Sequence, residues 1–333
     1  MSFEFVKKLP TPSEIKEQYP VPEKLVALKK ERDQEIRDVL TGKSNKFLVI
    51  IGPCSADHED PVVDYVSRLA PVQEKVKDRI LIVPRIYTNK PRTTGEGYKG
   101  IASQPDPEKA PDMIEGIISS RKMFLRAMEE SGLSAADEML YPENWGYVED
   151  LLSYVAIGAR SVEDQHHRLT VSGFDVASGM KNPTSGDLAV MLNSVYAAQH
   201  PHHFSFAGHE VETTGNPWAH VILRGAVSKH GNSTQNYHYE DIMRLIEKYD
   251  KMDVVNPAVL PVRRSAKVLQ MMIMAGVSVS AILQTIAVRQ EKVMTSQKKR
   301  LVRSYSVLRT TVSYIRSQIS MERTRSLVSV TVT

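Results

Sequence analysis

Short apolar runs alternate with amphipathic segments along most of this chain, and this alternation constrains the fold more than any other feature. The runs 46–55 (KFLVIIGPCS) and 79–86 (RILIVPRI) are apolar almost throughout, as in strands that are buried on both faces. Segments with a helical spacing of apolar residues lie between and after such runs. Buried strands that alternate with amphipathic helices predict an α/β fold with a parallel sheet. The alternation alone fits both an open doubly wound sheet and a closed barrel.

The same pattern predicts the individual elements. Strands are predicted at 46–55, 79–86, 135–140, 155–162, 176–181 and 220–224. Helices are predicted near 23–39, 61–76, 112–131, 145–154, 187–199 and 239–249. Residues 202–216 predict an inserted hairpin, because Phe204 and Phe206 alternate with other residues and Gly215-Asn216 is a typical turn pair. Four prolines punctuate residues 1–45, which we expect to form an N-terminal extension.

Basic residues are concentrated at the C-terminal end of the chain. Residues 262–333 hold 13 Lys and Arg residues against two acidic ones, whereas 1–261 hold 30 basic and 37 acidic residues. The excess of positive charge is therefore a property of the last segment, and we expect no nucleic-acid partner. We divide the chain into an N-terminal extension (1–45), an α/β body (46–259) and an atypical basic C-terminal segment (260–333).

The uncharged run 268–288 is long enough to cross a membrane. Gln270, Gln284 and several hydroxyl residues dilute it, so we interpret the run as buried protein core and expect no membrane association. Hydrophobic residues make up 41% of the chain and charged residues 25%, a mixture typical of globular proteins. Because the chain has a single cysteine and opens without an apolar segment, we expect a cytoplasmic protein without disulfides.

Polar residues stand at the ends of the predicted strands. They are Cys54, Arg85, Glu138, Arg160, Lys181 and Arg224. The carboxyl ends of parallel barrel strands point to one mouth, so these side chains would meet there. A single arginine at a strand end usually forms only a salt bridge. Four cationic strand ends out of six instead predict an anion site, since guanidinium groups bind phosphate and carboxylate through two hydrogen bonds at once.

Two further features bear on chemistry. The loop Lys90-Pro91-Arg92-Thr93-Thr94, with three glycines close behind it, is typical of a phosphate-binding loop, although a solvated flexible loop has the same composition. For Cys54 the residues leave three interpretations open: a small buried hydrophobe, a nucleophile or a metal ligand.

Five short runs occur in an order and at spacings that resemble those of class I 3-deoxy-D-arabino-heptulosonate 7-phosphate (DAHP) synthases. They are 51–55 (IGPCS), 90–94 (KPRTT), 156–160 (AIGAR), 179–182 (GMKN) and 220–225 (HVILRG). The resemblance covers about residues 1–258. It implies a (β/α)8 TIM barrel with an N-terminal extension and an inserted β-hairpin. It also implies a transferase that condenses phosphoenolpyruvate with erythrose 4-phosphate to DAHP and phosphate. This reaction is the first step of the shikimate pathway to chorismate and the aromatic amino acids.

The resemblance implies roles for individual residues. Phosphoenolpyruvate would be held by Arg85, Lys90, Arg160, Lys181 and Arg224. Erythrose 4-phosphate would be held by Arg92 and Thr93, and the expected catalytic residues are Lys90, Glu138 and His167. Cys54 would be a ligand of a divalent metal such as Mn, Fe, Co or Zn, which acts as a Lewis acid on the aldehyde oxygen. The family further implies a homo-oligomer and feedback inhibition by an aromatic amino acid.

The resemblance stops near residue 260. The family's other metal ligands are a histidine, a glutamate and an aspartate in motifs of the last third, and none of these motifs follows Pro257. Beyond residue 261 there is no histidine or aspartate, and the only acidic residues are Glu291 and Glu322. A frameshift near residue 260 and a diverged tail would both produce this pattern. We therefore expect the last barrel strands and three metal ligands to be missing, and the chain to fold poorly or to be inactive.

Three alternative functions remain open from the sequence. An enzyme similar to 3-deoxy-octulosonate 8-phosphate synthase, acting on arabinose 5-phosphate, shares the chemistry, although the run 90–94 favours the heptulosonate enzyme. A barrel relic that binds an anion or effector without catalysis would fit the missing metal ligands. A basic tail that binds nucleic acid or an acidic membrane is the third alternative, but Lys298-Lys299-Arg300 is the only basic cluster in that segment.

Overall fold

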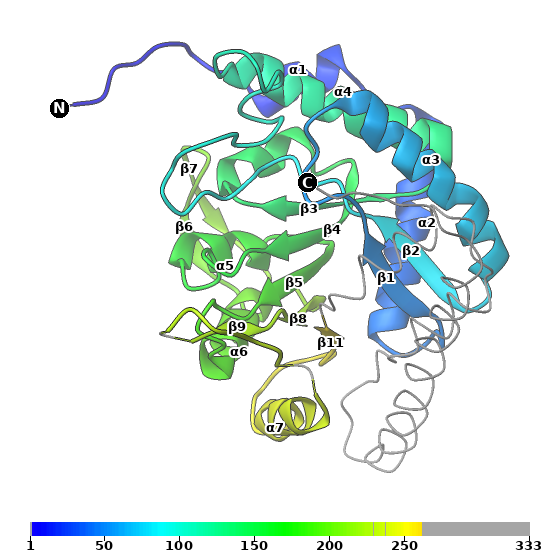
Figure 1. Cartoon of the computed structure of the whole chain (residues 1–333), viewed down its shortest axis with the longest axis vertical. Helices are drawn as coiled ribbons and strands as arrows, with labels where there is room; N and C mark the ends of the chain where they lie inside the picture. Colours follow the sequence, from blue (N-terminus) through cyan, green and yellow to red (C-terminus); the bar gives the residue numbers. More distant parts are fainter. Residues whose placement is uncertain (1, 229, 237, 262–333) are drawn as a thin grey trace, which may run out of the picture.

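The computed structural model describes residues 2–228, 230–236 and 238–261 (Figure 1). At its centre, parallel strands lie side by side in the order in which they occur in the chain. These are β1 (Phe47–Ile51), β2 (Ile80–Pro84), β3 (Ala135–Met139), β4 (Leu152–Ile157), β5 (Ala177–Lys181), β8 (Ala219–Leu223) and β11 (Val259–Pro261). β1 pairs with β2, the other five form one sheet, and a parallel bridge between Arg85 and Ala136 joins the two parts. The predicted parallel α/β fold is confirmed, and this strand order is that of a TIM barrel.

Alternate residues of the strands pack into two different cores, as the two-residue period of a strand requires. In β2, Ile80 and Ile82 belong to the large core under the helices. Leu81 and Val83 belong to a second core with one residue or more from nearly every other strand. The second core lies inside the curved sheet. Because every residue of β2 is buried, the strand reads as a continuous apolar run in the sequence.

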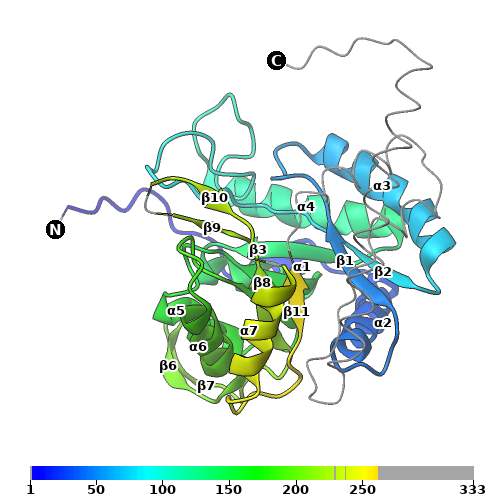
Figure 2. The same ribbon diagram turned by 60° about the horizontal axis from the view of Figure 1, so that its bottom comes forward.

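Helices cover the outer face of the sheet (Figures 1 and 2). They are α3 (Glu59–Val76), α4 (Met113–Ser131), α5 (Gln165–Ser172), α6 (Leu188–Gln199) and α7 (Tyr239–Tyr249). The α4 prediction is confirmed, including its ends: Asp112 caps the first turn by accepting hydrogen bonds from backbone N–H groups, and Gly132 ends the helix with φ 66°. The apolar stripes of these helices complete the outer core.

Two helices precede the first strand. α1 (Pro12–Gln18) begins with a capping box between Thr11 and Glu14. The predicted helix near 23–39 is confirmed as α2 (Glu23–Leu40), which presents Ile36, Val39 and Leu40 to the core inside the sheet. α2 thus extends the inner core of the barrel.

The structure corrects several sequence-based predictions. The helix predicted at 145–154 is wrong: a 3₁₀ helix, η1 (Pro142–Tyr147), is followed by β4, which begins at Leu152 and ends at Ile157 rather than spanning 155–162. Helix α5 was not predicted. The run EDLLSYVAI spaces its apolar residues in a way that fits a helix or a buried strand, and the sequence alone did not separate the two.

The inserted hairpin is confirmed, but its turn lies elsewhere. It consists of β6 (His203–Phe206) and β7 (His209–Glu212), and it turns at Ala207-Gly208, where φ is 49° and 78°. Positive φ at both central residues is the geometry of the tight turns that match strand twist. Gly215-Asn216 instead leads from the hairpin towards β8. A second small hairpin, β9 (Ala226–Val227) and β10 (Ser233–Thr234), was not predicted.

The predictions for 262–333 lie outside the described residues. They concern the uncharged run 268–288, the basic C-terminal segment and the expected loss of the last barrel strands. Among the helices that the structure describes, none is both long and apolar enough to cross a membrane.

Candidate active site

The predicted site residues follow or end strands whose carboxyl ends point in one direction. Cys54 lies in the segment after β1, Arg85 directly follows β2, and Lys181 is the last residue of β5. Glu138 is the penultimate residue of β3, and Arg224 directly follows β8. This end of the sheet, which we call the mouth, therefore carries three cations and one buried carboxylate.

Cys54, Arg85 and Lys90 form one cluster at the mouth. The Lys90 ammonium donates a hydrogen bond to Cys54 Sγ at 2.7 Å, and Arg85 Nη2 donates to the Cys54 carbonyl at 3.2 Å. Cys54 is exposed, so the interpretation as a buried hydrophobe is wrong. The thiol of Cys54 thus points at the ammonium that is expected to hold phosphoenolpyruvate.

Lys181 and Glu138 form an ion pair across β4, and both side chains are largely buried. Gly158 lies beside this pair, and a Cβ at that position would lie 2.6 Å from Glu138 Oε1. Gly158 therefore leaves the space that the carboxylate occupies. A buried pair of this kind needs its partners in good geometry, because each charge has lost most of its hydration.

We expect Gly158→Ala to push the Glu138 carboxylate away from Lys181 and to lower the free energy of unfolding by about 1–3 kcal/mol, the usual cost of overpacking. Urea denaturation measures this loss. Gly173→Ala is a matched control, because its new Cβ would meet the Thr213 methyl at 3.1 Å, a longer contact than that at Gly158 and with an uncharged group. Equal stability of the two variants would contradict the tight fit at Gly158.

Tyr87 connects the two clusters, and the sequence analysis missed it. Its ring lies under the Arg85 guanidinium at 3.8 Å and 5.2 Å from Lys181 Nζ. Burial raises the pKa of the Tyr87 hydroxyl, so the ring is a neutral platform for both cations. Tyr87 stands two residues after Arg85, which puts both on one side of an extended chain. That spacing was the signal that could have identified it.

Two guanidinium groups at the mouth keep unused hydrogen-bond donors. Arg85 Nε and Arg224 Nη1 are buried and have no hydrogen-bond partner among the described residues. The Arg224 backbone is fixed by its N–H, which donates to Asn182 Oδ1 at 2.9 Å. Buried unpaired donors are costly, and an anion in the mouth would pair with them.

Other predicted residues lie apart from these clusters. Arg92 and Thr93 are exposed in the loop after β2, where Arg92 Nε donates to the Tyr98 carbonyl at 2.8 Å. Arg160 is exposed in the turn after β4 rather than at the end of a strand. No hydrogen bond or ion pair within the described ranges joins the Arg160 side chain to Glu138, the carboxylate of the mouth.

His167 is buried on helix α5, not on a strand. One ring nitrogen bonds the Asp164 carboxylate, and the other lies 3.0 Å from the Leu140 carbonyl oxygen. Both nitrogens therefore have partners that hold the ring just beyond the end of β3. His166, its neighbour, faces the hairpin, with ring centroids 6.4 Å from Phe204 and 6.1 Å from Phe206.

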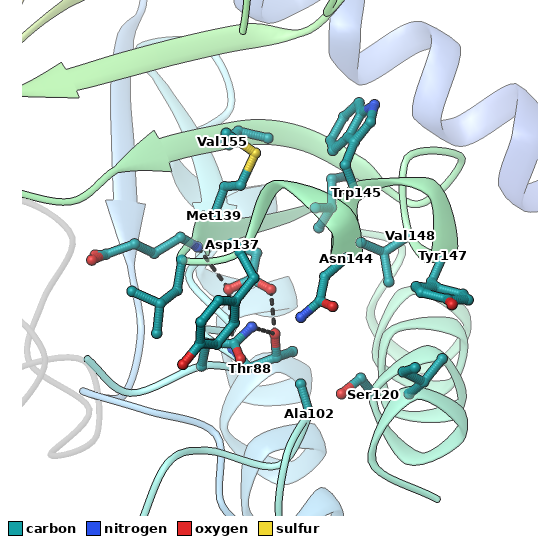
Figure 3. A pocket seen from close by; sticks show the side chains of 16 residues that line it. Thr88, Ala102, Ser120, Asp137, Met139, Asn144, Trp145, Tyr147, Val148 and Val155 are labelled. Carbon is teal, nitrogen blue, oxygen red and sulfur yellow. Dashed lines mark hydrogen bonds between the residues drawn. The ribbon is translucent and has the colours of Figure 1, made fainter. Parts of the chain in front are cut away.

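A small cavity lies behind the mouth, between β3, η1 and α4 (Figure 3). Asp137 enters it and accepts hydrogen bonds from the Thr88 amide at 3.0 Å and the Thr88 hydroxyl at 2.5 Å. Burial raises the pKa of Asp137 to about 7, against the lowering effect of these hydrogen bonds. Asn89, which also lines the cavity, has a buried side-chain oxygen without a hydrogen-bond partner among the described residues.

A second buried titratable group lies deeper in the barrel. His220 Nδ1 donates to the Trp218 carbonyl at 2.9 Å, so Nε2 accepts from the Tyr154 hydroxyl at 2.8 Å. Burial lowers the pKa of His220 to about 4. The ring is therefore neutral at physiological pH.

His220 makes stability depend on pH in a defined direction. Its pKa is lower in the folded than in the unfolded chain, so its contribution is complete above pH 6.5 and is lost as pH falls towards 4. We expect a loss of about 3 kcal/mol from this group alone. Asp137, whose folded pKa is raised, has the opposite slope between pH 4 and 7. The His220 contribution is therefore measured as the difference in unfolding free energy between the protein and His220→Gln. A difference that stays constant from pH 7 to 4 would contradict it.

The residues of the mouth do not fit a metal centre. Among residues 2–228, 230–236 and 238–261, no three His, Cys, Asp or Glu side chains lie close enough together to hold a metal ion. Cys54 Sγ faces an ammonium instead, and the sequence beyond residue 261 adds only two glutamates as ligand types. Catalytic zinc sites typically use three protein ligands.

Comparison with known proteins agrees with the geometry of the mouth. Residues 18–260 match the model of the DAHP synthetase I family. The chain belongs to this family. The match begins in α1 and ends within β11, at the point where the family motifs stop in the sequence. The resemblance seen in the sequence and the TIM-barrel type of fold are thereby confirmed.

Curated relatives carry the name phospho-2-dehydro-3-deoxyheptonate aldolase. The protein of Haemophilus influenzae is 37% identical over 253 residues, which are 74% of this chain and 68% of that protein. That of Corynebacterium glutamicum is 33% identical over 246 residues, 72% of this chain and 65% of the relative. The Phe-sensitive protein of Escherichia coli is 38% identical over 227 residues, 66% and 64% of the two chains. The chain thus matches about two thirds of its relatives' length.

A solved structure gives the same result for the fold. The phospho-2-dehydro-3-deoxyheptonate aldolase of Francisella tularensis superposes with a TM-score of 0.75 at 25% sequence identity. The superposition covers 94% of this chain and 99% of that one. The family of DAHP synthases is generally metal-dependent.

Proposed function

We propose that the mouth of this DAHP synthetase I family member binds phosphoenolpyruvate and condenses it with erythrose 4-phosphate, giving DAHP and inorganic phosphate. The observation that carries this proposal is the set of cations around the mouth. Arg85 and Arg224 keep buried donors that meet no partner in the part of the chain that the structure describes, and Lys90 and Lys181 stand beside Cys54 and Glu138. Phosphoenolpyruvate carries a phosphate and a carboxylate, and each can take two hydrogen bonds from such groups.

Charge balance explains why Glu138 belongs to the site. In the free protein its carboxylate neutralises Lys181, so that the buried ammonium is never unpaired. We propose that the phosphate of the substrate replaces Glu138 as the partner of Lys181. Glu138 and Lys90 are then the titratable groups of the mouth that can exchange protons during the reaction.

The condensation forms one carbon–carbon bond and, at C2, replaces the bond to the phosphate oxygen by a bond to the oxygen of water, whose protons go to the former aldehyde oxygen and to the leaving phosphate. C3 of phosphoenolpyruvate attacks the aldehyde carbon of the sugar phosphate, water adds at C2, and phosphate leaves from C2. Cations around the phosphate stabilise the negative charge of the leaving group. We assign Arg92 and Thr93, exposed on the loop beside Lys90, to the phosphate of erythrose 4-phosphate, and Arg160 to the carboxylate or phosphate of phosphoenolpyruvate. The catalytic role of His167 stays a prediction.

Further properties are proposed from the family. Two Escherichia coli relatives are named Tyr-sensitive and Phe-sensitive, and we propose inhibition of this chain by an aromatic amino acid. We also propose that the protein is cytoplasmic and forms a homo-oligomer. Within each chain we propose an N-terminal extension at 1–45, a barrel body at 46–259 and a separate segment from 260. The resemblance implies a divalent metal such as Mn, Fe, Co or Zn, for which Cys54 is the one ligand among the predicted site residues.

One observation favours a second candidate function. The Lys90 ammonium lies against Cys54 Sγ, where a metal would bring a second positive charge, so the mouth is better suited to holding an anion than a metal. A barrel that binds phosphoenolpyruvate or a related effector without turning it over would use the same cations. This is the binding relic considered from the sequence.

Phosphate release by the purified chain separates the two candidates. The assay contains phosphoenolpyruvate with erythrose 4-phosphate, or with arabinose 5-phosphate, and is run with Mn(II) and with a chelator. Release that needs both phosphoenolpyruvate and erythrose 4-phosphate supports the condensation. Binding of phosphoenolpyruvate without release identifies the relic, and a preference for arabinose 5-phosphate identifies the octulosonate reaction. A folded chain that binds neither substrate would overturn both candidates.

A further inference from the structure

We propose that Asp137 is a positioning residue, which acts from behind the mouth to hold Lys90 and Glu138 in place through Thr88 and the β3 backbone. The inference rests on the proposed function, because it concerns residues assigned to phosphoenolpyruvate. Asp137 was not among the residues that the sequence singled out. Its hydrogen-bond donors belong to two segments of the mouth, the loop after β2 and strand β3.

Three hydrogen bonds converge on the Asp137 carboxylate. Oδ1 accepts from the Thr88 amide at 3.0 Å and from the Glu138 amide at 2.6 Å, and Oδ2 accepts from the Thr88 hydroxyl at 2.5 Å. One of these donors is the backbone of Glu138 itself. The other two belong to a residue only two positions before Lys90. A single carboxylate thus joins the strand end that carries the acid to the loop that carries the lysine.

Strand geometry explains why Asp137 can do this without reaching the substrate. Successive side chains of a strand point to opposite faces, so Asp137 lies on the outer face when Glu138 faces the mouth. Figure 3 shows the Asp137 side chain directed towards Thr88, inside the cavity that Asn144 and Trp145 also line. Asp137 is 6% exposed, and most neighbours of the strand on this face are apolar.

Burying a carboxyl group in such a place costs free energy unless hydrogen bonds offset its lost hydration. Burial of a polar group without partners costs a few kcal/mol, and an apolar residue would fill this face of β3 more cheaply. Thr88 is also fixed from the other side, since its carbonyl accepts from the Ala102 amide at 3.1 Å. The loop is therefore clamped at Thr88, and Lys90 follows with its own N–H bonded to the Lys99 carbonyl at 2.8 Å.

The position of Lys90 can be measured without any substrate. Cys54 is the only cysteine of the chain, is exposed and accepts the hydrogen bond of Lys90. An ammonium group at this distance stabilises the thiolate, which is the form that reacts with alkylating reagents. The alkylation rate of Cys54 at fixed pH thus reports how closely Lys90 is held. The rate in Lys90→Met gives the value for complete loss of the contact.

Two matched pairs of variants test the proposal in the full chain. Asp137→Ala removes all three hydrogen bonds and Thr88→Val removes only the one from the hydroxyl, whereas Asp137→Asn keeps an oxygen that accepts from the two backbone amides and Thr88→Ser keeps the hydroxyl. We expect Asp137→Ala to move the alkylation rate most of the way to that of Lys90→Met and to weaken phosphoenolpyruvate binding about tenfold, and Thr88→Val to move both in the same direction by a smaller amount. The conservative pair is expected to stay within about twofold of the unmodified protein in both measurements.

Each outcome decides the matter. Unchanged alkylation and unchanged phosphoenolpyruvate binding in Asp137→Ala and Thr88→Val would overturn the proposal. So would equal losses in the disruptive and conservative variants. If Asp137→Ala fails to fold, Thr88→Val with Thr88→Ser gives the answer alone. If the unmodified chain does not bind phosphoenolpyruvate at all while the alkylation rates follow the expected order, the proposed function fails and the positioning role of Asp137 stands.

Discussion

Replacing Arg121 with methionine is expected to lower the free energy of unfolding by about 3–5 kcal/mol, the usual cost of breaking a buried ion pair. The Arg121 side chain is completely buried on α4 and forms two hydrogen bonds of 2.8 Å with the Asp150 carboxylate. It also donates to the Tyr19 carbonyl at 2.7 Å and the Tyr147 carbonyl at 2.9 Å. The variant leaves one carboxylate and two carbonyl groups without their donor. Urea denaturation followed by circular dichroism measures the loss.

The same helix offers a matched control. Arg126 forms ion pairs with Glu59, Asp60 and Glu130, but it lies at the surface. We expect Arg126→Met to change stability little, because exposed ion pairs gain little over their hydrated state. Tyr19 lies between α1 and α2, so Arg121→Met is also expected to expose the chain near residue 19 to proteases. Similar losses of stability in the two variants would show that the number of ion pairs matters more than their burial.

Replacing Lys181 with methionine is the second large change. It leaves the Glu138 carboxylate buried without its cation, and we expect a loss of about 3–5 kcal/mol in unfolding free energy at neutral pH. Phosphoenolpyruvate binding should disappear as well, because Lys181 is one of the cations assigned to it. Urea denaturation curves and a binding titration measure both effects.

A double variant separates stability from binding. Glu138→Gln together with Lys181→Met removes both charges, and replacing a whole buried pair is often close to neutral for stability. We therefore expect the double variant to regain most of the lost stability and still not to bind phosphoenolpyruvate. A single variant Lys181→Met as stable as the parent would contradict the buried pair. A double variant that binds as well as the parent would contradict its role in the site.

The framework of the fold could be predicted because burial on both faces leaves a plain signal. β1 and β2 are read directly from FLVII and ILIVP, and the parallel direction of the strands follows from their alternation with helices. The order of the strands did not follow from that alternation, because an open doubly wound sheet would show it as well. The region 142–157 was misread for a physical reason. A short 3₁₀ helix and a buried strand with similar apolar spacing resemble one amphipathic helix when only the sequence is considered.

The candidate site was predicted in part. Arg85, Glu138 and Lys181 stand where parallel strands end. Their meeting at one mouth could therefore be predicted from the parallel direction of the strands. Arg160 lies beyond such an end, in a turn whose course no pattern fixes. Asp137 was missed because strand alternation places it on the outer face, where a polar residue reads as solvent-facing until the helices that bury it are known.

Calorimetric titration of the full chain with phosphoenolpyruvate tests the central claim most directly, namely that the mouth of this barrel is a phosphoenolpyruvate site. The account predicts saturable binding of one molecule per chain. It also predicts a loss of affinity of about tenfold or more in Lys90→Met, which removes one charged hydrogen bond. The double variant of Glu138 and Lys181 should show no measurable binding. A folded chain that does not bind phosphoenolpyruvate, or binds it equally well without these lysines, would contradict the account.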